Sequence, residues 1–332
     1  VAATPYTIRH PRTVQRVGYA LIGPVQRLFE HVDATPGEYT EADISPYFWH
    51  NGKYPDSSEY QALAADGFAD YRLRVNGLVD NPVELSMADL RALGEHEQIT
   101  QHFCIQGWSG IAKWGGVSMQ SVMDLVRPAP KAKWVVFYSL GDGPDGGAYY
   151  DAHPMEQMAY HLTMLAYDMN GEPLPARHGY PVRMVVPGLY GYVSATKWVT
   201  QIELTRWEDY DAYWIPRGWS KEGPIKTMSR VDTDRRGATP NDVIVGGVAW
   251  AVHRGISRVE VRSDGGEWFE ADLGGVPSDD TWKQWMVTLE LEPGRHMVES
   301  RAYDGDGAPQ TEQTAPVAPN GAQGYPRRWI DV

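Results

Sequence analysis

The stretch Asn170-Gly171-Glu172-Pro173-Leu174-Pro175, followed by His178-Gly179-Tyr180-Pro181-Val182-Arg183, does most to define this chain. Prolines and glycines frame short apolar runs there, and further along the loop Ser194-Ala195-Thr196-Lys197 follows. Basic side chains on strand ends and exposed backbone N–H groups in a glycine-hinged loop are placed where an anion could bind. The alternative is that Arg183 and Lys197 are solvated surface cations, as such residues usually are.

Cys104 is the only cysteine among 332 residues, so no intrachain disulfide is available. It lies in His102-Phe103-Cys104-Ile105-Gln106-Gly107-Trp108, and Trp114-Gly115-Gly116-Val117 follows closely. A lone cysteine is commonly a small buried hydrophobe. Glycine steps and tryptophans this close to it indicate instead a backbone brought near something large and flat. The pair His102-x-Cys104 could hint at zinc, but no convincing third ligand follows in sequence.

The bulk composition is that of a globular protein, with 42% hydrophobic and 22% charged residues. A chain of 332 residues exceeds what one core usually supports, so two domains are expected. The net charge of −13 argues against a nucleic-acid-binding surface. No run of 18 apolar residues is present, so no membrane-spanning helix is expected. The start at Val1 and the membrane-proximal character of residues 1–45 favour an extracytoplasmic or membrane-associated location, with a cytoplasmic location as the alternative.

The pattern along the chain divides it into three parts. Residues 1–45 form an N-terminal arm with one amphipathic helix expected at Val14–His31. Residues 46–215 mix short helices with strands without regular alternation, which predicts an α+β domain. Residues 216–332 hold a linker and then, from about residue 240, strands only, which is typical of an immunoglobulin-like sandwich. The segment 206–240 is expected to connect the two domains.

The individual elements follow from caps, periodicity and turn residues. In the mixed domain the expected elements are a helix at Met87–Leu93 capped by Ser86, a helix at Met119–Val126, a glycine-rich loop at Asp142–Gly147, a strand and turn at Tyr71–Val75 and Asn76-Gly77, and strands at Trp134–Leu140, Pro181–Pro187 and Trp198–Leu204. In the C-terminal region they are strands at Val243–Trp250, Arg258–Arg262, Trp268–Asp272, Met286–Leu291 and His296–Tyr303, with a hairpin turn at Asp264-Gly265-Gly266.

Several familiar chemistries lack their motifs. The chain has no Gly-x-Gly-x-x-Gly and no P-loop, so nicotinamide and nucleoside triphosphate sites have no support. It has no Cys-x-x-Cys-His for covalent haem and no Gly-x-Ser-x-Gly nucleophile turn.

Together with Leu165–Pro175, these motifs resemble the sulfite oxidase family of molybdenum-cofactor enzymes. The segment Cys104–Trp108 looks like the family's metal-ligating cysteine loop, and the stretch from Gly218 to Val231 resembles the start of its second domain. The likeness covers roughly residues 46–330. It implies a sulfite-oxidase-like molybdopterin-binding α+β domain, followed by an all-β immunoglobulin-like domain of the kind that often mediates dimers. A homodimer is therefore expected.

The resemblance also implies roles for particular residues. Cys104 would bind molybdenum beside the two dithiolene sulfurs of one molybdopterin, and a thiolate suits a soft metal already held by sulfur. The residues expected to hold the pterin and its phosphate are His50, Asn51, His178, Arg183 and Lys197, with the backbone at Ser194, Ala195 and Thr196. Asp142 would lie near the family's active-site acidic position, and His50 and Trp108 would line the substrate pocket.

Two departures from the family pattern bear on the substrate. Sulfite oxidases proper carry an arginine where this chain has His50, and Gly-Asn-Arg-Arg where it has Gln106–Ser109. Histidine is only partly charged near neutral pH, so a pocket of His50 and Trp108 should favour neutral sulfoxides or N-oxides over sulfite. Efficient sulfite turnover would require other arginines, such as Arg217 or Arg230, to rebuild the anion site.

The function expected from these features is a mononuclear molybdenum oxidoreductase that transfers an oxygen atom to or from a small oxo substrate, by sulfoxide or N-oxide reduction or by sulfite-type oxidation. The haem domain of the animal enzymes is absent, so an external redox protein or membrane cytochrome should carry the electrons. Two alternatives remain open. Cys104 could be a histidine-activated nucleophile without a metal. The chain could also be a cofactor-free surface binding module, although its retention of Cys104, His178 and Arg183 argues against that.

Overall fold

The computed structural model describes residues 40–52, 54–55, 57–206, 211–237 and 241–332. The expected helix at Val14–His31 lies outside the described residues. Contacts divide the chain into two compact units, and each is described by itself. The first holds Tyr47–Cys104 and Ser109–Gly223, and the second contains Ile105–Trp108 and Pro224–Val332. The chain therefore passes from one unit to the other at Gly223–Pro224, and the boundary expected at residue 215 stays a prediction.

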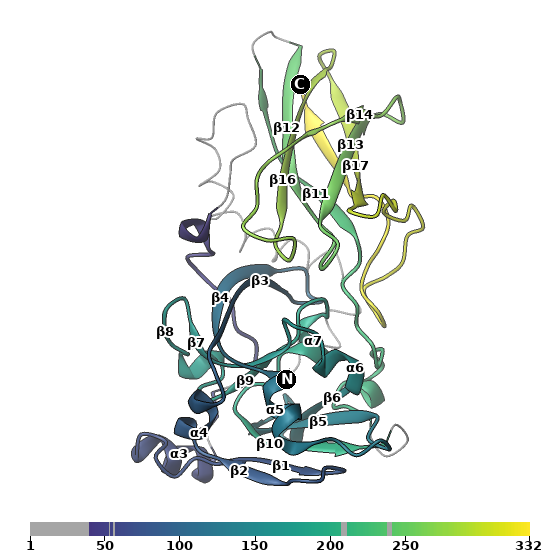
Figure 1. Cartoon of the computed structure of the whole chain (residues 1–332). Coiled ribbons are helices and arrows are strands. Elements are labelled where there is room, and N and C mark those ends of the chain that lie inside the picture. The colour runs from purple at the N-terminus through teal and green to yellow at the C-terminus, as the bar shows by residue number, and fades with distance from the viewer. Residues whose placement is uncertain (1–39, 53, 56, 207–210, 238–240) are drawn as a thin grey trace. The chain divides into compact units, whose positions relative to one another are not determined.

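The first unit contains a five-stranded sheet (Figure 1). Its strands run in the order β2 (Val83–Leu85), β1 (Leu73–Gly77), β10 (Val199–Thr205), β5 (Trp134–Asp142) and β6 (Ala148–Pro154). β1 and β10 pair in parallel, and the other pairs are antiparallel. The glycine-rich segment 143–147 forms the turn between β5 and β6, as expected.

A second, curved sheet of the same unit carries the cysteine. Its strands are β3 (His96–Phe103), β4 (Ser109–Ser118), β7 (Met164–Met169) and β8 (Glu172–Pro173), with β9 (Arg183–Val185) paired to β7. β3 and β4 form an antiparallel hairpin in which Phe103 pairs with Ser109. Cys104 is the first residue beyond β3, so the hairpin sets where its side chain can lie.

Short helices surround the two sheets. They are α3 (Ser58–Ala65), α4 (Met87–Ala92), α5 (Met119–Val126), α6 (Met155–Met158) and α7 (Gly191–Ser194), with 3-10 turns at Ala176–His178 and Ile215–Arg217. The 3-10 turn at Glu41–Asp43 belongs to the second unit. Ser86 caps α4 in a reciprocal box with Asp89, which confirms the expected start of that helix. The apolar residues of α5 are buried on one side, where the helix packs against β4 and β7.

One hydrophobic core joins both sheets of the first unit. Leu73 and Phe137 come from the first sheet, and Leu165 and Met184 come from the second, and all four are completely buried. A mixed α+β architecture with short helices around two sheets is therefore observed, as the pattern predicted. The site described below lies on elements anchored in this core.

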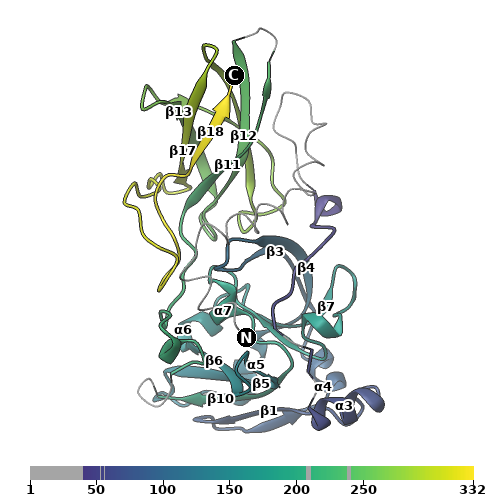
Figure 2. The same ribbon diagram turned by 180° about the vertical axis from the view of Figure 1, so that it is seen from behind.

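The second unit is built of strands in two four-stranded antiparallel sheets, which Figure 2 shows from behind. One sheet has the order β11 (Met228–Arg236), β12 (Asp242–Trp250), β16 (Lys283–Glu290) and β15 (Asp272–Leu273). The other has the order β14 (Phe269–Glu270), β13 (Ile256–Ser263), β17 (Arg295–Asp304) and β18 (Arg327–Asp331). Val245 and Trp285 from the first of these sheets share a core with Val259, Val298 and Ala302 from the second.

Three expectations about elements were wrong. The segment 206–240 is not only a connector, because β11 lies within it and pairs along its length with β12. The strand expected at Trp268–Asp272 is split between β14 and β15, which belong to different sheets. The split falls at Ala271, which is buried and donates its N–H to the Val259 carbonyl. Asn76 and Gly77 belong to β1, because Gly77 pairs with Leu204.

No helix within the described residues is long and apolar enough to cross a membrane.

Candidate active site

Cys104 is buried at the end of β3, and an amide group faces its sulfur. The Nδ2 of Asn51 donates a hydrogen bond to the Cys104 Sγ across 3.2 Å. The same amide is held in that orientation because its Oδ1 accepts from the Trp49 indole at 3.2 Å. A donor aimed at sulfur favours the thiolate form, which is the form that binds a metal.

Lys197 meets the same asparagine from the other side. Its Nζ donates to the Asn51 carbonyl at 2.7 Å and to the Arg177 carbonyl at 3.1 Å. The ammonium group also lies 4.2 Å from the centre of the Trp198 ring. Asn51 thus joins the thiol and the lysine, although Cys104 lies 53 residues and Lys197 lies 146 residues further along the chain.

Arg183 is a buried cation at the start of β9. Only 3% of the residue is exposed, its Nη1 donates to the His178 carbonyl at 3.1 Å, and its guanidinium lies 4.7 Å from the Trp114 ring centre. Its Nε is buried and has no hydrogen-bond partner within the described residues. Burial lowers the pKa of Arg183 to about 10, so it stays charged at neutral pH.

The histidines of the site are neutral at physiological pH. The rings of His50 and His178 lie 5.7 Å apart, edge to face. Burial, followed by the charge of Arg183, lowers the pKa of His178 to about 3. Burial and Lys197 also lower the pKa of His50. Each ring can therefore donate one N–H without adding a charge.

The cations of this cluster lack carboxylate partners. No ion pair involving Arg183 or Lys197 occurs among the described residues. Burial, with Arg183 as the second cause, lowers the pKa of Lys197 to about 7. A buried lysine whose protonation is further disfavoured by a neighbouring arginine indicates a site that lacks a negative charge, and a bound anion would supply it.

Gly179 lies against the first side-chain carbons of both cations. Gly179 has φ of +119°, and a Cβ placed on it would lie 2.9 Å from the Cβ of Arg183 and 3.1 Å from that of Lys197. Only a residue without a side chain fits between them. The N–H of Trp198 donates to the Gly179 carbonyl at 3.2 Å, which ties the lysine loop to this turn.

In the segment expected to hold the phosphate, the hydroxyls of Ser194 and Thr196 are engaged within the protein. The Ser194 hydroxyl donates to the Leu189 carbonyl at 3.0 Å, and the Thr196 hydroxyl donates to Asp151 at 3.1 Å. The carbonyls of Ser194 and Thr196 accept N–H groups of Val186 and Met184 beside β9. Ala195 is the half-buried C-cap of α7. Any contribution of Ser194 to an anion in this arrangement comes from its backbone.

Asp142 lies at the end of β5, exposed to solvent, and lines an open cavity of about 130 Å³ together with Tyr54, Leu140 and Gly141. This cavity adjoins the lysine loop, because Gly141 lies against the Trp198 indole and the Ser139 hydroxyl donates to the Lys197 carbonyl.

Trp108 is half-buried and follows the turn that leaves Cys104. Residues 105–108 group with the second unit, whereas Cys104 belongs to the first.

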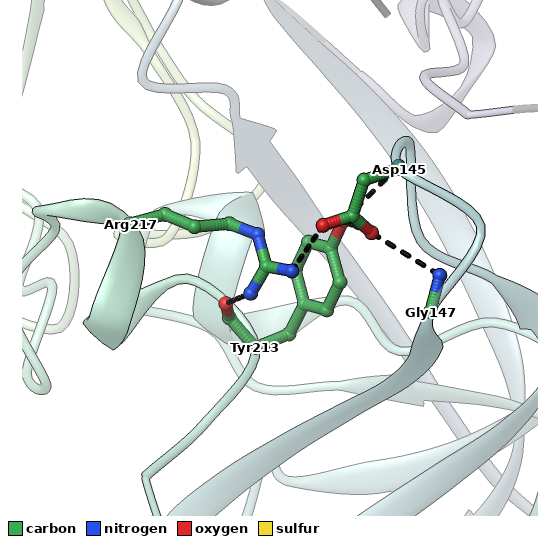
Figure 3. Close-up of polar contacts among 4 residues, drawn as sticks. All are labelled: Asp145, Gly147, Tyr213 and Arg217. Carbon is green, nitrogen blue, oxygen red and sulfur yellow. Dashed lines mark hydrogen bonds and ion pairs between the residues drawn. The ribbon is translucent and has the colours of Figure 1, made fainter.

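The two arginines considered as replacements for an anion site are already neutralised. Arg217 forms an ion pair with Asp145, donates to the Tyr213 carbonyl and stacks 3.7 Å from the Tyr213 ring centre (Figure 3). Asp145 also accepts from the Tyr213 hydroxyl at 2.5 Å. In the second unit, Arg230 pairs with Asp232. Neither arginine is available to replace the arginines that sulfite oxidases proper carry at the positions of His50 and Gln106–Ser109.

Sequence reasoning missed several residues of the site. Phe48 forms its aromatic floor, with ring centres 5.5 Å from Trp114, 5.6 Å from His178 and 5.8 Å from His102. The pairing of aromatic residues with glycines around Cys104 was the signal that could have identified Trp114. Asp151, on a strand with no unusual pattern, carried no such signal. The zinc hint finds no support in the described part of the chain, where no three metal-ligating residues cluster.

Comparisons with known proteins agree with this geometry. Residues 60–214 match the family model described as an oxidoreductase molybdopterin binding domain. The chain is 28% identical to the sulfite oxidase of Gallus gallus over 299 residues, covering 75% of this chain and 65% of that protein. It is 30% identical over 158 residues to the catalytic subunit of the protein-methionine-sulfoxide reductase of Campylobacter jejuni, covering 42% of this chain and 53% of that protein.

The fold has a solved counterpart in the sulfane dehydrogenase SoxCD from Paracoccus pantotrophus. The TM-score is 0.64 at 24% identity, over 79% of this chain and 76% of that one. The chain spans between about half and two thirds of the length of the two curated relatives described above.

Proposed function

Since this chain belongs to the sulfite oxidase family of molybdopterin-binding oxidoreductases, we propose that it transfers an oxygen atom to or from a small substrate at a metal held by Cys104. The observation that carries this proposal is a buried thiol joined to Lys197 through one asparagine, with Arg183 as a second buried cation and no carboxylate partner for either cation among the described residues.

The residues present fit a molybdenum–molybdopterin cofactor. Cys104 would be the protein ligand to the metal, and the Asn51 amide would stabilise its thiolate. Arg183, with its buried Nε unsatisfied, and Lys197 would hold the anionic part of the cofactor. The neutral rings of His50 and His178 would orient the pterin, and the cavity beside Asp142 adjoins the loop that carries Lys197. When bound, this group supplies two-electron oxygen-atom transfer chemistry.

The pocket favours a neutral or weakly charged substrate. His50 stands where sulfite oxidases proper carry an arginine, and its pKa is lowered, so it is uncharged at neutral pH. Arg217 and Arg230 are paired with Asp145 and Asp232, which removes them as substitutes. Among the described residues, the further cation whose charge acts on His50 and His178 is Arg177, which is exposed to solvent. Sulfoxide or N-oxide reduction is therefore the proposed direction, with sulfite oxidation as the alternative.

The remaining parts of the function are also proposals. An external redox protein or membrane cytochrome would exchange electrons with the metal, and the location would be extracytoplasmic or membrane-associated. The two packed sheets of the second unit support an immunoglobulin-like domain that pairs two copies of the chain. Neither alternative, a cysteine nucleophile without a metal or a binding module without a cofactor, explains why Arg183 and Lys197 are placed together without a carboxylate.

The test is to purify the full chain from a molybdenum-replete host and to measure molybdenum and released pterin. About one equivalent of each is expected, since the site has one thiol. Turnover of methionine sulfoxide, trimethylamine N-oxide and sulfite is then compared with artificial electron carriers. Absence of both molybdenum and pterin would refute the cofactor assignment, and efficient sulfite oxidation would refute the substrate assignment.

A further inference from the structure

Asp151 is a buried carboxyl group on β6 that contacts the loop 194–197, where the cofactor phosphate is expected to bind. None of its surface is exposed. Its Oδ2 accepts the Tyr149 hydroxyl at 2.8 Å and the Thr196 hydroxyl at 3.1 Å. Its Oδ1 is buried and has no hydrogen-bond partner within the described residues. The carboxyl group therefore touches the loop through one residue, Thr196, whose neighbour in sequence is Lys197.

The surroundings of Asp151 do not neutralise its charge. The titratable groups that face it are Tyr149 on its own strand, Tyr192 on α7, and His153 two residues further along β6. Burial lowers the pKa of His153 to about 4, so that ring is neutral. No cation pairs with Asp151 in the part of the chain that the structure describes. Burial raises the pKa of Asp151 to about 7, against the opposing effect of its two hydroxyl donors.

An alternative hydrogen-bond acceptor is available near Asp151 when the carboxyl group is neutral. The Tyr149 hydroxyl also lies 3.3 Å from the Tyr192 carbonyl, which can accept its single hydrogen. A proton on Oδ2 would find an acceptor among the hydroxyls, whereas a proton on Oδ1 would find none. A neutral carboxyl group is also a weaker acceptor than a carboxylate, so it holds the Thr196 hydroxyl less strongly.

We propose that Asp151 is a proton-dependent positioning residue for the loop 194–197. Uptake of one proton releases the Thr196 hydroxyl from the carboxylate, so that the hydroxyl can donate to an anion bound beside Lys197. The inference rests on the proposed function, because that anion is taken to be the phosphate of the cofactor. It makes the hold on the cofactor stronger when Asp151 is protonated than when it is ionised.

Lys197 changes charge in the same pH range, so the two groups must be separated. Asp151→Asn supplies a side chain of the same shape that is neutral at every pH, which leaves only the contribution of Lys197. Thr196→Val keeps the shape of the threonine and removes the hydroxyl. Ser194→Ala is the matched control, because the Ser194 hydroxyl lies on the same loop but donates to the Leu189 carbonyl.

The experiment measures the rate at which the full, cofactor-loaded chain loses molybdopterin during dialysis at about pH 6 and about pH 8.5, on either side of the titration. The retained pterin is read by fluorescence after denaturation. Wild type should lose pterin faster at the higher pH. Asp151→Asn should slow the loss at the higher pH by at least about threefold, within the range of one hydrogen bond to a charged group.

Thr196→Val should lose pterin faster than wild type at about pH 6 and at about the wild-type rate at about pH 8.5, and adding Asp151→Asn to it should change nothing further. Ser194→Ala should keep the wild-type ratio of the two rates. The inference is overturned if Asp151→Asn keeps the wild-type ratio, or if it slows the loss equally in the Thr196→Val background. Tyr149→Phe provides a second test of the inference in case the Asp151→Asn variant does not fold. It removes one donor to the carboxylate, and it should shift the pH dependence upward.

A failure of the proposed function would be recognised separately, because wild type would then release no pterin at any pH. The proton on Asp151 can still be measured from the unfolding of the cofactor-free full chain. The folded state keeps this proton up to about pH 7, whereas an unfolded aspartate loses it near about pH 3.9. Wild-type stability should therefore fall as the pH rises between these values, by more than that of Asp151→Asn. Identical slopes would overturn the inference.

Discussion

Two groups of cations in this molecule have opposite surroundings. Beside Cys104, Arg183 and Lys197 approach each other with no carboxylate partner in the described residues. On the outer face of the β13–β17–β18 sheet in the second unit, each arginine lies against a carboxylate or an aromatic ring. These arginines are Arg258, Arg262, Arg301 and Arg327.

The paired group follows the register of the sheet. Glu260 on β13 is directly opposite Arg301 on β17, and their side chains pair at 2.5 Å. Glu299, with only 1% of its side chain exposed, accepts from Arg262 on one side and Arg327 on the other, each at 2.6 Å. The Trp268 ring lies between the guanidinium groups of Arg262 and Arg301, at 4.4 and 4.1 Å.

The difference shows how to distinguish a structural arginine from a ligand-binding one. The cations of the second unit are satisfied by the fold itself, so they stabilise it without offering a site. The cations near Cys104 are held by carbonyl groups and rings, which orient them and leave their charge uncompensated. The following predictions test this difference, beginning with the largest expected effect.

Cys104→Ser should separate the metal from the anion site. We expect the variant to fold and to retain pterin, because Arg183 and Lys197 are unchanged. Its activity should fall by more than the roughly 10–100-fold that follows loss of a group merely supporting a metal ligand. The measurements are turnover and the Mo(V) electron paramagnetic resonance signal. Wild-type activity would contradict the assignment of Cys104 as the ligand.

Glu299→Gln should leave two arginines without their shared carboxylate. We expect the free energy of unfolding to fall by about 3 kcal/mol, at the low end of the range for breaking a buried pair, because Arg327 is partly exposed. Urea denaturation at neutral pH measures this loss, and the pterin content should equal that of wild type. A reduced pterin content in the folded variant would contradict a purely structural role.

Arg183→Met and Arg301→Met make the comparison directly. The first change should weaken cofactor binding by about 1.5–3 kcal/mol, through loss of a charge-assisted hydrogen bond, without lowering the stability of the cofactor-free protein to the same extent. The second should leave cofactor binding unchanged and lower the free energy of unfolding by up to about 1 kcal/mol. Pterin retention and denaturant unfolding of both variants provide the test. Equal effects on pterin would show that the two regions do not differ.

The titration of Lys197 should have the smallest effect, because it alters cofactor retention only through the change of its charge with pH. Its pKa is lowered to about 7, so its charge is lost as the pH rises through neutrality, and affinity for an anion falls in the same direction. The fall should be no more than about tenfold per pH unit. Lys197→Arg keeps the charge and should flatten the profile of pterin retention, measured in the Asp151→Asn background. An unchanged slope would place the titration elsewhere.

The sequence predicted those parts of the fold whose signals are local. α5 begins and ends at Met119 and Val126, as expected, and α4 begins after its expected Ser86 cap. β11 was missed because its second half is charged and half-exposed, so its strand character comes from pairing with β12. β18 has a single buried residue, Ile330, which is too little for a periodic pattern.

For the site, the sequence identified the chemistry but not the contacts. Cys104, Arg183 and Lys197 stood out by their surroundings, and the structure places Lys197 and Cys104 on the same asparagine. That Asn51 bridges them could not be read from the chain, because it depends on side-chain contacts between residues far apart in sequence. Asp151 was not identified because its importance comes from burial without a cation, which only packing reveals.

The close approach at Gly179 has a consequence for selectivity between anions of different size. The Cβ atoms of Arg183 and Lys197 both lie so close to Gly179 that a Cβ there would be 2.9 and 3.1 Å from them, so the spacing at which the two side chains begin depends on a residue without a side chain. An anion that both cations reach is bound from two side chains of set starting points, so its size matters. Addition of one methyl group, as in Gly179→Ala, would force the cations apart and alter the preferred size without removing either charge.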